Sequence, residues 1–238
     1  MIQKGLNILY PPVCPFCGHI SPEGICARCR EKIIHVKEPF CMHCGKPLDD
    51  ETQEYCRDCG RRIAASARGS CIAQGRGLWI HREPVSGAVY RFKYKNKRNW
   101  GRIFANEMEK HYGSQIRRWE IKQIIPIPLH VSKRRKRGFN QSEIIARELS
   151  FLTGIPCKTD VLFRVKKTVP QKFLDNSGRA ENLRGAFAVS RKWEAPRNIL
   201  LIDDIYTTGA TLERAAKMLK KAGARNIYFL TISIGQGI

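Results

Sequence analysis

No apolar run in this sequence approaches the ~20 residues that a membrane-spanning helix needs, although hydrophobic residues make up 42% of its 238 residues. The stretch from Met1 to Val13 contains one lysine and no long apolar core, which makes it a poor signal peptide. We therefore expect no membrane insertion and a cytoplasmic location. The length suits one substantial domain with a small one beside it.

Acidic residues are scarce, because 21 Asp and Glu stand against 43 Lys and Arg and leave a net charge of +22. The deficit is uneven along the chain. Residues 61–140 carry a net +16 and residues 141–238 a net +7, whereas residues 1–60 are nearly neutral at −1. A basic region of this density favours a polyanionic partner such as nucleic acid. We expect that partner on the middle of the chain.

Isolated cysteines are also few, since eight of the ten form four Cys-x-x-Cys pairs within residues 14–59. Two such pairs can complete a tetrahedral Zn²⁺ site, whereas redox-active pairs do not come four in a row. With no ligand missing, both sites should be closed and structural. Interleaved pairing is the alternative to sequential pairing. In sequential pairing one zinc binds Cys14, Cys17, Cys26 and Cys29, and the other binds Cys41, Cys44, Cys56 and Cys59.

Residues 198–212 are the most informative stretch. An apolar run ends in Asp203 and Asp204, a turn of small residues follows, and an amphipathic helical pattern begins at Leu212. A loop before a helix N-terminus offers backbone N–H groups to an anion, and adjacent carboxylates suit a sugar with neighbouring hydroxyls. The alternative is a turn in which an aspartate only caps the backbone.

The same stretch resembles the signature that binds 5-phosphoribosyl-1-pyrophosphate (PRPP) in type I phosphoribosyltransferases. The resemblance implies that the carboxylates hold the ribose hydroxyls, directly or through Mg²⁺, and that the loop binds the 5-phosphate. The residues predicted to bind PRPP here are Asp203, Asp204, Thr207, Thr208, Gly209, Ala210 and Thr211.

Two basic blocks lie in the middle of the chain. In residues 91–100 cations alternate with aromatic residues, as in proteins that hold single strands by their backbone and bases; the aromatic residues would equally suit the buried face of a helix. Residues 133–137 are predicted to form a basic loop between a strand and a helix, with Arg135 and Arg137 binding a pyrophosphate; a solvated charged face is the alternative. The residues predicted to bind single-stranded DNA are Lys93, Lys95, Lys97 and Arg98.

A series of motifs runs along the chain: the cysteine pairs, residues 92–95, 126–129 and 137–141, Gln171, Arg179, and residues 182–187 and 203–211. Their order resembles that of the ComF family, also called ComFC, with GntX-like members. The resemblance covers nearly the whole chain and implies a phosphoribosyltransferase-like domain behind an N-terminal zinc ribbon, with a role in natural competence and DNA uptake. The doubled cysteine pairs imply two metals.

The expected fold is α/β, of the type I phosphoribosyltransferase kind: a mostly parallel sheet flanked by helices in residues 63–238, behind a double zinc-ribbon module in residues 1–62 that needs metal to fold. The ligand should lie at the carboxyl ends of the strands. Gln171, Arg179 and Asn182 either face the ligand or brace their loop. Strands are expected at 122–128, 158–164, 198–203 and 226–232, and helices over 84–110 with a break at 98–99, at 141–153 and at 211–222.

No residue pattern identifies a general base or an acceptor site, so three functions compete. The first is a working phosphoribosyltransferase that binds PRPP with Mg²⁺. The second is a DNA-handling adaptor that keeps the PRPP pocket without turnover. The third is a scaffold whose zinc module docks a partner protein such as a helicase.

Overall fold

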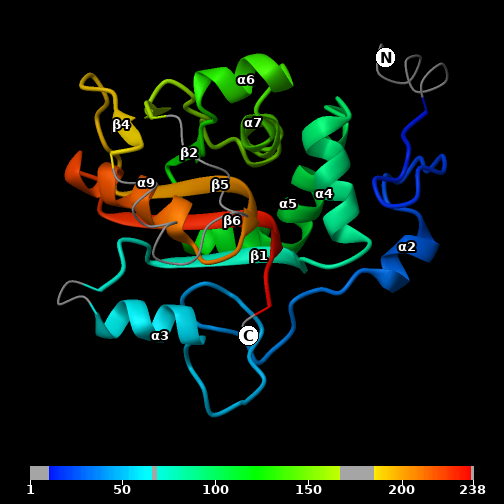
Figure 1. The fold of residues 1–238 in the computed structure, drawn as a ribbon, viewed down its shortest axis with the longest axis horizontal. Coiled ribbons are helices and arrows are strands. Elements are labelled where there is room, and N and C mark those ends of the chain that lie inside the picture. The colour runs from blue at the N-terminus through cyan, green and yellow to red at the C-terminus, as the bar shows by residue number, and fades with distance from the viewer. Residues whose placement is uncertain (1–10, 66–68, 167–184, 237–238) are drawn as a thin grey trace.

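A central sheet of four parallel strands, in the order β1-β6-β5-β2, organises the fold (Figure 1). The computed structural model describes residues 11–65, 69–166 and 185–236. The short strands β3 (Leu162–Arg164) and β4 (Phe187–Val189) form a separate antiparallel pair. The central strands are β1 (Gln74–Ile80), β2 (Gln123–Pro126), β5 (Asn198–Tyr206) and β6 (Asn226–Ile234).

Helices cover both faces of this sheet. On one face lie α4 (Val85–Tyr94), α5 (Trp100–Arg118) and α7 (Gln141–Thr153), and on the other lies α9 (Ala210–Lys221). Side chains on a strand alternate between the faces. Leu200 and Ile202 accordingly belong to one buried cluster and Ile199 and Leu201 to the other.

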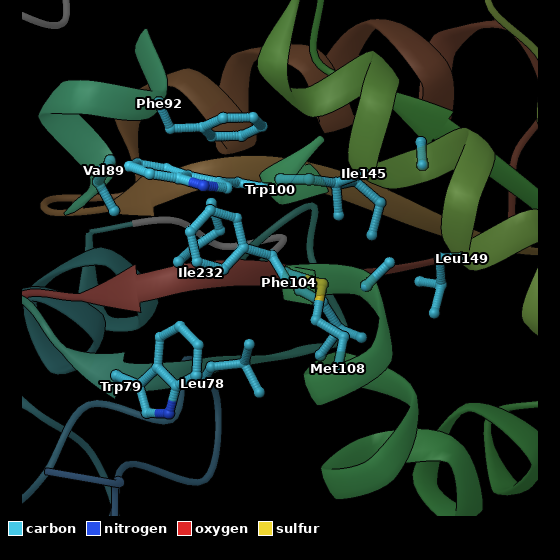
Figure 2. Close-up of a cluster of buried hydrophobic side chains, with 14 of the residues drawn as sticks. Leu78, Trp79, Val89, Phe92, Trp100, Phe104, Met108, Ile145, Leu149 and Ile232 are labelled. Carbon is cyan, nitrogen blue, oxygen red and sulfur yellow. The ribbon is translucent and has the colours of Figure 1, made fainter. Parts of the chain in front are cut away.

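The larger cluster lies between the sheet and α4, α5 and α7. Figure 2 shows Phe92 of α4 beside Trp100 and Phe104 of α5, over Ile232 of β6. The rings of Phe92 and Phe104 meet edge to face, with their centres 5.2 Å apart. This packing fixes the end of α4 against the sheet, which matters because the basic residues of α4 lead toward the carboxyl edge of the strands.

The two zinc ribbons extend the two clusters. The first, with α2 (Ala27–Lys32), joins the cluster that contains Trp79 of β1, whereas the second, with α3 (Arg57–Ala64), joins the cluster under α9. The buried side chains of each ribbon thus continue into the main domain. A domain boundary at residue 62 stays a prediction.

The structure matches most of the expected elements and corrects several, among them the strand expected at 158–164, which is shortened to β3 (Leu162–Arg164). The break near residues 98–99 separates α4 from α5, and α5 continues to Arg118. The basic block 133–137 is not a loop, as predicted, but lies in the helix α6 (Val131–Arg137), because lysine and arginine are good helix formers and Gly138, with φ +80°, ends the helix. β5 also extends past the predicted residue 203 to Tyr206.

Candidate functional site

The cysteine pairs form two clusters in the sequential arrangement. In each cluster the four sulfur atoms lie within 4.8 Å of one another. Four thiolates at this spacing suit a closed tetrahedral Zn²⁺ site, whose metal contributes folding stability rather than catalysis. The prediction of two structural zinc sites is confirmed. In the second site His43 is an outer neighbour: its Nδ1 lies 3.4 Å from Cys59 Sγ, and its Nε2 lies 3.0 Å from the Ile72 carbonyl oxygen.

The acidic pair lies where β5 passes the carboxyl edge of the sheet. Asp203 Oδ1 accepts hydrogen bonds from the Asp204 N–H at 2.9 Å and from Ser142 Oγ at 3.1 Å. Asp204 Oδ1 lies 2.9 Å from Lys93 Nζ. Burial, reinforced by the Asp204 charge, raises the pKa of Asp203 to about 7. The pair therefore suits a ligand that brings a cation or hydroxyl donors to these oxygens.

A small hollow follows the acidic pair, in front of the N-terminus of α9. Gly209 adopts φ +77°, and a Cβ at this position would lie 2.5 Å from the Tyr206 hydroxyl, so only glycine fits. The Thr208 hydroxyl is buried without a hydrogen-bond partner in the described residues. Backbone N–H groups before a helix suit an anion such as a phosphate, whereas Thr208 does not line the hollow. The hollow is lined by Asp203, Ile205, Tyr206, Thr207, Gly209, Ala210, Thr211 and Leu212.

Partly buried cations surround this edge of the sheet. Burial lowers the pKa of Lys133, and the nearby charges of Arg164 and Arg137 lower it further. Burial also lowers the pKa of Arg164, but the Asp203 carboxyl opposes that shift. Cations that are kept close together and partly out of water attract an anion of high charge. Lys133 and Arg164 were not singled out from the sequence, since they lie on elements that only the fold brings to Asp203.

Arg137 and Arg135, the predicted pyrophosphate residues, differ in their surroundings. Arg137 Nη1 donates to Gln141 Oε1 at 2.6 Å, and its guanidinium lies 4.9 Å from the centre of the Tyr94 ring. Arg135 is exposed on α6. Asn140 explains part of the motif at 137–141, because its buried amide donates to the Ile127 carbonyl at 2.9 Å and fixes the start of α7 against the end of β2.

The four residues predicted to bind nucleic acid do not share one environment. Lys93 reaches the acidic pair, whereas Lys95, Lys97 and Arg98 are exposed. The aromatic residues divide similarly, because Phe92 is buried in the core while Tyr94 is 58% exposed. Tyr90 is also 58% exposed, and its ring centre lies 4.9 Å from that of Tyr94. An exposed tyrosine pair beside cations is a suitable platform for stacking bases.

Two further residues at the site carry no signal in the sequence. His81 follows β1, and its Nδ1 lies 2.9 Å from Ser233 Oγ. Burial lowers the pKa of His81, and the Lys93 charge adds to this effect, so the imidazole is neutral near pH 7 and able to accept a proton. Arg62 of α3 reaches from the second ribbon to the loop, where its Nη2 donates to the Thr208 carbonyl at 2.5 Å.

Gln171, Arg179 and Asn182 lie outside the described residues. No helix in the described part of the chain combines the length and the apolar character needed to cross a membrane.

Comparisons with known proteins agree with the two parts of this architecture. The double zinc ribbon domain family matches residues 5–60. Competence protein F of Haemophilus influenzae is 35% identical over 150 residues, which cover 61% of this chain and 66% of that protein. Competence protein ComFC of Streptococcus pneumoniae is 27% identical over 154 residues, 64% of each chain. The DNA utilization protein YhgH of Escherichia coli K12 is 31% identical over 102 residues, 43% of this chain and 44% of that protein.

Solved structures give a more distant likeness. An adenine phosphoribosyltransferase matches 62% of this chain and 74% of its own, with a TM-score of 0.39 and 13% identity. The glutamine PRPP amidotransferase of B. subtilis matches 59% of this chain and 30% of its own, with a TM-score of 0.37 and 18% identity.

The parallel sheet flanked by helices, the acidic end of β5 and the two four-cysteine clusters define a double zinc ribbon joined to an α/β domain with a parallel central sheet. The predicted fold class is confirmed. The chain is similar to competence protein F and to ComFC, as the motifs indicated. Its matches span just under two thirds of the competence proteins and less than half of YhgH.

Proposed function

We propose that this chain binds PRPP at the carboxyl edge of its sheet and handles single-stranded DNA in a competence pathway. The names of its relatives, two competence proteins and a DNA utilization protein, support the pathway. The observation that carries the PRPP assignment is local. A carboxylate pair, a small hollow before a helix N-terminus and a set of partly buried cations lie near one another, and these match the hydroxyls, the 5-phosphate and the pyrophosphate of one ligand.

Each group has a distinct role in this assignment. Asp203 and Asp204 hold the ribose hydroxyls, and the loop from Thr207 to Thr211 holds the 5-phosphate with its N–H groups and hydroxyls. The pyrophosphate lies toward Arg137, with Arg135 reaching it from the exposed side of α6. Lys133 and Arg164 add positive charge to the same side of the site.

The acidic pair also fits Mg²⁺. Two adjacent carboxylates, one with a raised pKa, are relieved by a cation, and Lys93 Nζ supplies that charge at 2.9 Å from Asp204. Mg²⁺ bound here with PRPP would be held by carboxylate oxygens and ligand oxygens, which it prefers, and would stabilise charge on the pyrophosphate. The residues can then support glycosyl transfer at C1.

A second binding function is favoured by the surface that we call the tyrosine platform, Tyr90 and Tyr94 with Lys95, Lys97 and Arg98. The exposed ring pair and the exposed cations suit the bases and the backbone of a single strand. Contact with a partner such as a helicase through the zinc ribbons is the alternative role for the front of the chain, and a pull-down that survives deletion of residues 1–62 would exclude it.

Calorimetric titration of the zinc-loaded protein with PRPP and Mg²⁺ tests the main proposal. We expect saturable binding that is lost in Asp203→Asn/Asp204→Asn and kept in the control Asp160→Asn, which removes an exposed carboxylate. The direction in which the double substitution changes the affinity for PRPP is diagnostic. PRPP is a polyanion, so removing two carboxylates would strengthen binding if they did not hold the sugar or its metal. Absent binding by the natural sequence, or equal or tighter binding by the double variant, would reject the assignment.

A further inference from the structure

The second zinc ribbon reaches the phosphate loop. Arg62, on the helix α3 that also contains Cys59, donates from Nη2 to the Thr208 carbonyl at 2.5 Å. Its guanidinium also interacts with the Tyr206 hydroxyl, and the Thr208 hydroxyl is buried without a hydrogen-bond partner in the described residues. Unused buried hydroxyls are uncommon, and these polar groups gather around one carbonyl of the loop. Specific polar groups therefore connect the second ribbon to the loop.

Tyr206 fills the space between the ribbon and the loop. Its ring stacks on Phe229 of β6, with ring centres 4.7 Å apart and planes within 4°. On the ribbon side Lys46 Nζ lies 5.9 Å from the centre of the Tyr206 ring and 2.7 Å from Asp58 Oδ2. On the loop side the hydroxyl lies so near Gly209 that a Cβ there would come within 2.5 Å. A shift of the ribbon would therefore be transmitted to the loop.

A held carbonyl orients the next N–H group. The peptide unit is planar and trans, so the Thr208 C=O and the Gly209 N–H point in opposite directions. Arg62 holds the carbonyl on the ribbon side, which turns the Gly209 N–H toward the hollow in front of α9. The guanidinium charge also lies directly behind the loop, where it attracts an anion bound in front.

We propose that Arg62 is a positioning residue for the phosphate ligand, so that the second zinc ribbon is a working part of the ligand site. The contacts described above support the ordering of the loop by Arg62. The identity of the ligand as PRPP rests on the proposed function. The first ribbon, which joins the other hydrophobic cluster, has no such role in the described part of the chain.

Arg62→Met tests this inference, with Arg61→Met as the matched control. Arg61 precedes Arg62 on α3 and is exposed. Both variants should retain two zinc ions per chain. Amide hydrogen exchange in residues 207–211 should become at least several-fold faster in Arg62→Met alone, and the Kd for Mg²⁺-PRPP should rise roughly tenfold, an effect of the size that a lost charge-assisted contact produces. Arg62→Lys, which keeps the charge and one donor, should restore part of both.

The two readouts separate this inference from the proposed function. If Arg62→Met leaves amide exchange in the loop unchanged, Arg62 does not position the loop, and the inference fails whether or not the protein binds PRPP. If exchange quickens but the natural sequence binds no PRPP, the proposed function fails while the ribbon-to-loop coupling stands. If Arg62→Met loses zinc or fails to fold, the same exchange measurement on Arg62→Lys decides. If Arg62→Lys exchanges as slowly as the natural sequence and binds Mg²⁺-PRPP with an unchanged Kd, the inference is overturned.

Discussion

Asp203 illustrates how a single ionisation can govern the site. Its carboxyl is buried beside Asp204, and its pKa is raised to about 7. An unfolded aspartate titrates near 3.9. Without ligand, the folded state therefore holds a proton that the unfolded chain has released, so this residue lowers stability as the pH rises from about 4 through 7. Ligand binding has the opposite dependence, because the carboxylate is the form that accepts a metal or hydroxyl hydrogens.

The affinity for Mg²⁺-PRPP should accordingly fall as the pH is lowered from 8 to 6. Below about pH 7 Asp203 must lose its proton on binding, which costs up to about tenfold in Kd per pH unit. Calorimetry in two buffers of different ionisation enthalpy measures the released proton directly. Asp204→Asn is the matched variant: it removes the charge that adds to burial in raising the pKa of Asp203, so the step in affinity should move part of the way to lower pH. No released proton at pH 6.5, or a step that Asp204→Asn leaves in place, would contradict this prediction.

At the scale of elements, the sequence indicated what is contiguous along the chain. A strand, an acidic pair, a small loop and a helix follow one another between residues 198 and 221, so local patterns sufficed to predict them, as they did the cysteine clusters. Ser142, Lys93 and Arg62 reach the same site from α7, α4 and α3. Only the packing of those helices brings them there, and no pattern within one segment encodes it.

The basic block 133–137 shows that a local pattern can also mislead. A charge run without apolar residues has no buried face and was interpreted as a loop, yet its residues have high helix propensity and a glycine in position to end a helix. Lys93 was predicted from the same kind of pattern. Its side chain turns from the solvent to Asp204 because α4 is fixed by the buried Phe92 on one side and the sheet edge on the other.

The junction of α2 with α5 provides a test of how the first ribbon is attached. Arg30 donates to both oxygens of Glu107, at 2.9 and 3.2 Å, and the Glu107 side chain is only 7% exposed. Arg30→Met should lower the free energy of unfolding by about 2 kcal/mol, below the 3–5 kcal/mol typical of a fully buried pair, because the Arg30 side chain is 35% exposed. Denaturant titration of the zinc-loaded protein measures this loss.

Arg28→Met is the control for that measurement, since Arg28 lies on the same helix and is exposed. It should change stability by less than about 0.5 kcal/mol. Adding Glu107→Gln to Arg30→Met should recover part of the loss, because the buried charge, left with His111 Nε2 alone at 3.6 Å, is then gone. Equal effects of the two arginine substitutions would show that Arg30 contributes no more than a surface charge.

At the scale of the whole molecule, the two proposed binding functions share residues. The ring of Tyr94 belongs to the tyrosine platform, and the guanidinium that covers it belongs to Arg137 of the proposed pyrophosphate site. One residue before Tyr94, Lys93 pairs with Asp204. The last turn of α4 thus faces the PRPP site with one side chain and the proposed DNA surface with the next. A ligand that draws Arg137 and Lys93 toward its phosphates removes positive charge from the platform.

Saturating Mg²⁺-PRPP should therefore weaken binding of single-stranded DNA, by about five- to tenfold at constant salt, the usual size of coupling between two sites. Fluorescence anisotropy with a labelled oligothymidine measures this, at matched ionic strength because the DNA contacts are salt-dependent. Lys97→Ala should lower DNA affinity with and without PRPP alike, since Lys97 is exposed and lies 6.0 Å from the Trp100 ring centre rather than at the acidic pair. Arg137→Met should lower DNA affinity and also reduce the effect of PRPP on DNA binding.

By reciprocity DNA must weaken PRPP binding by the same factor. A protein that binds both ligands with neither affecting the other would show that Arg137 and Lys93 do not link the two sites.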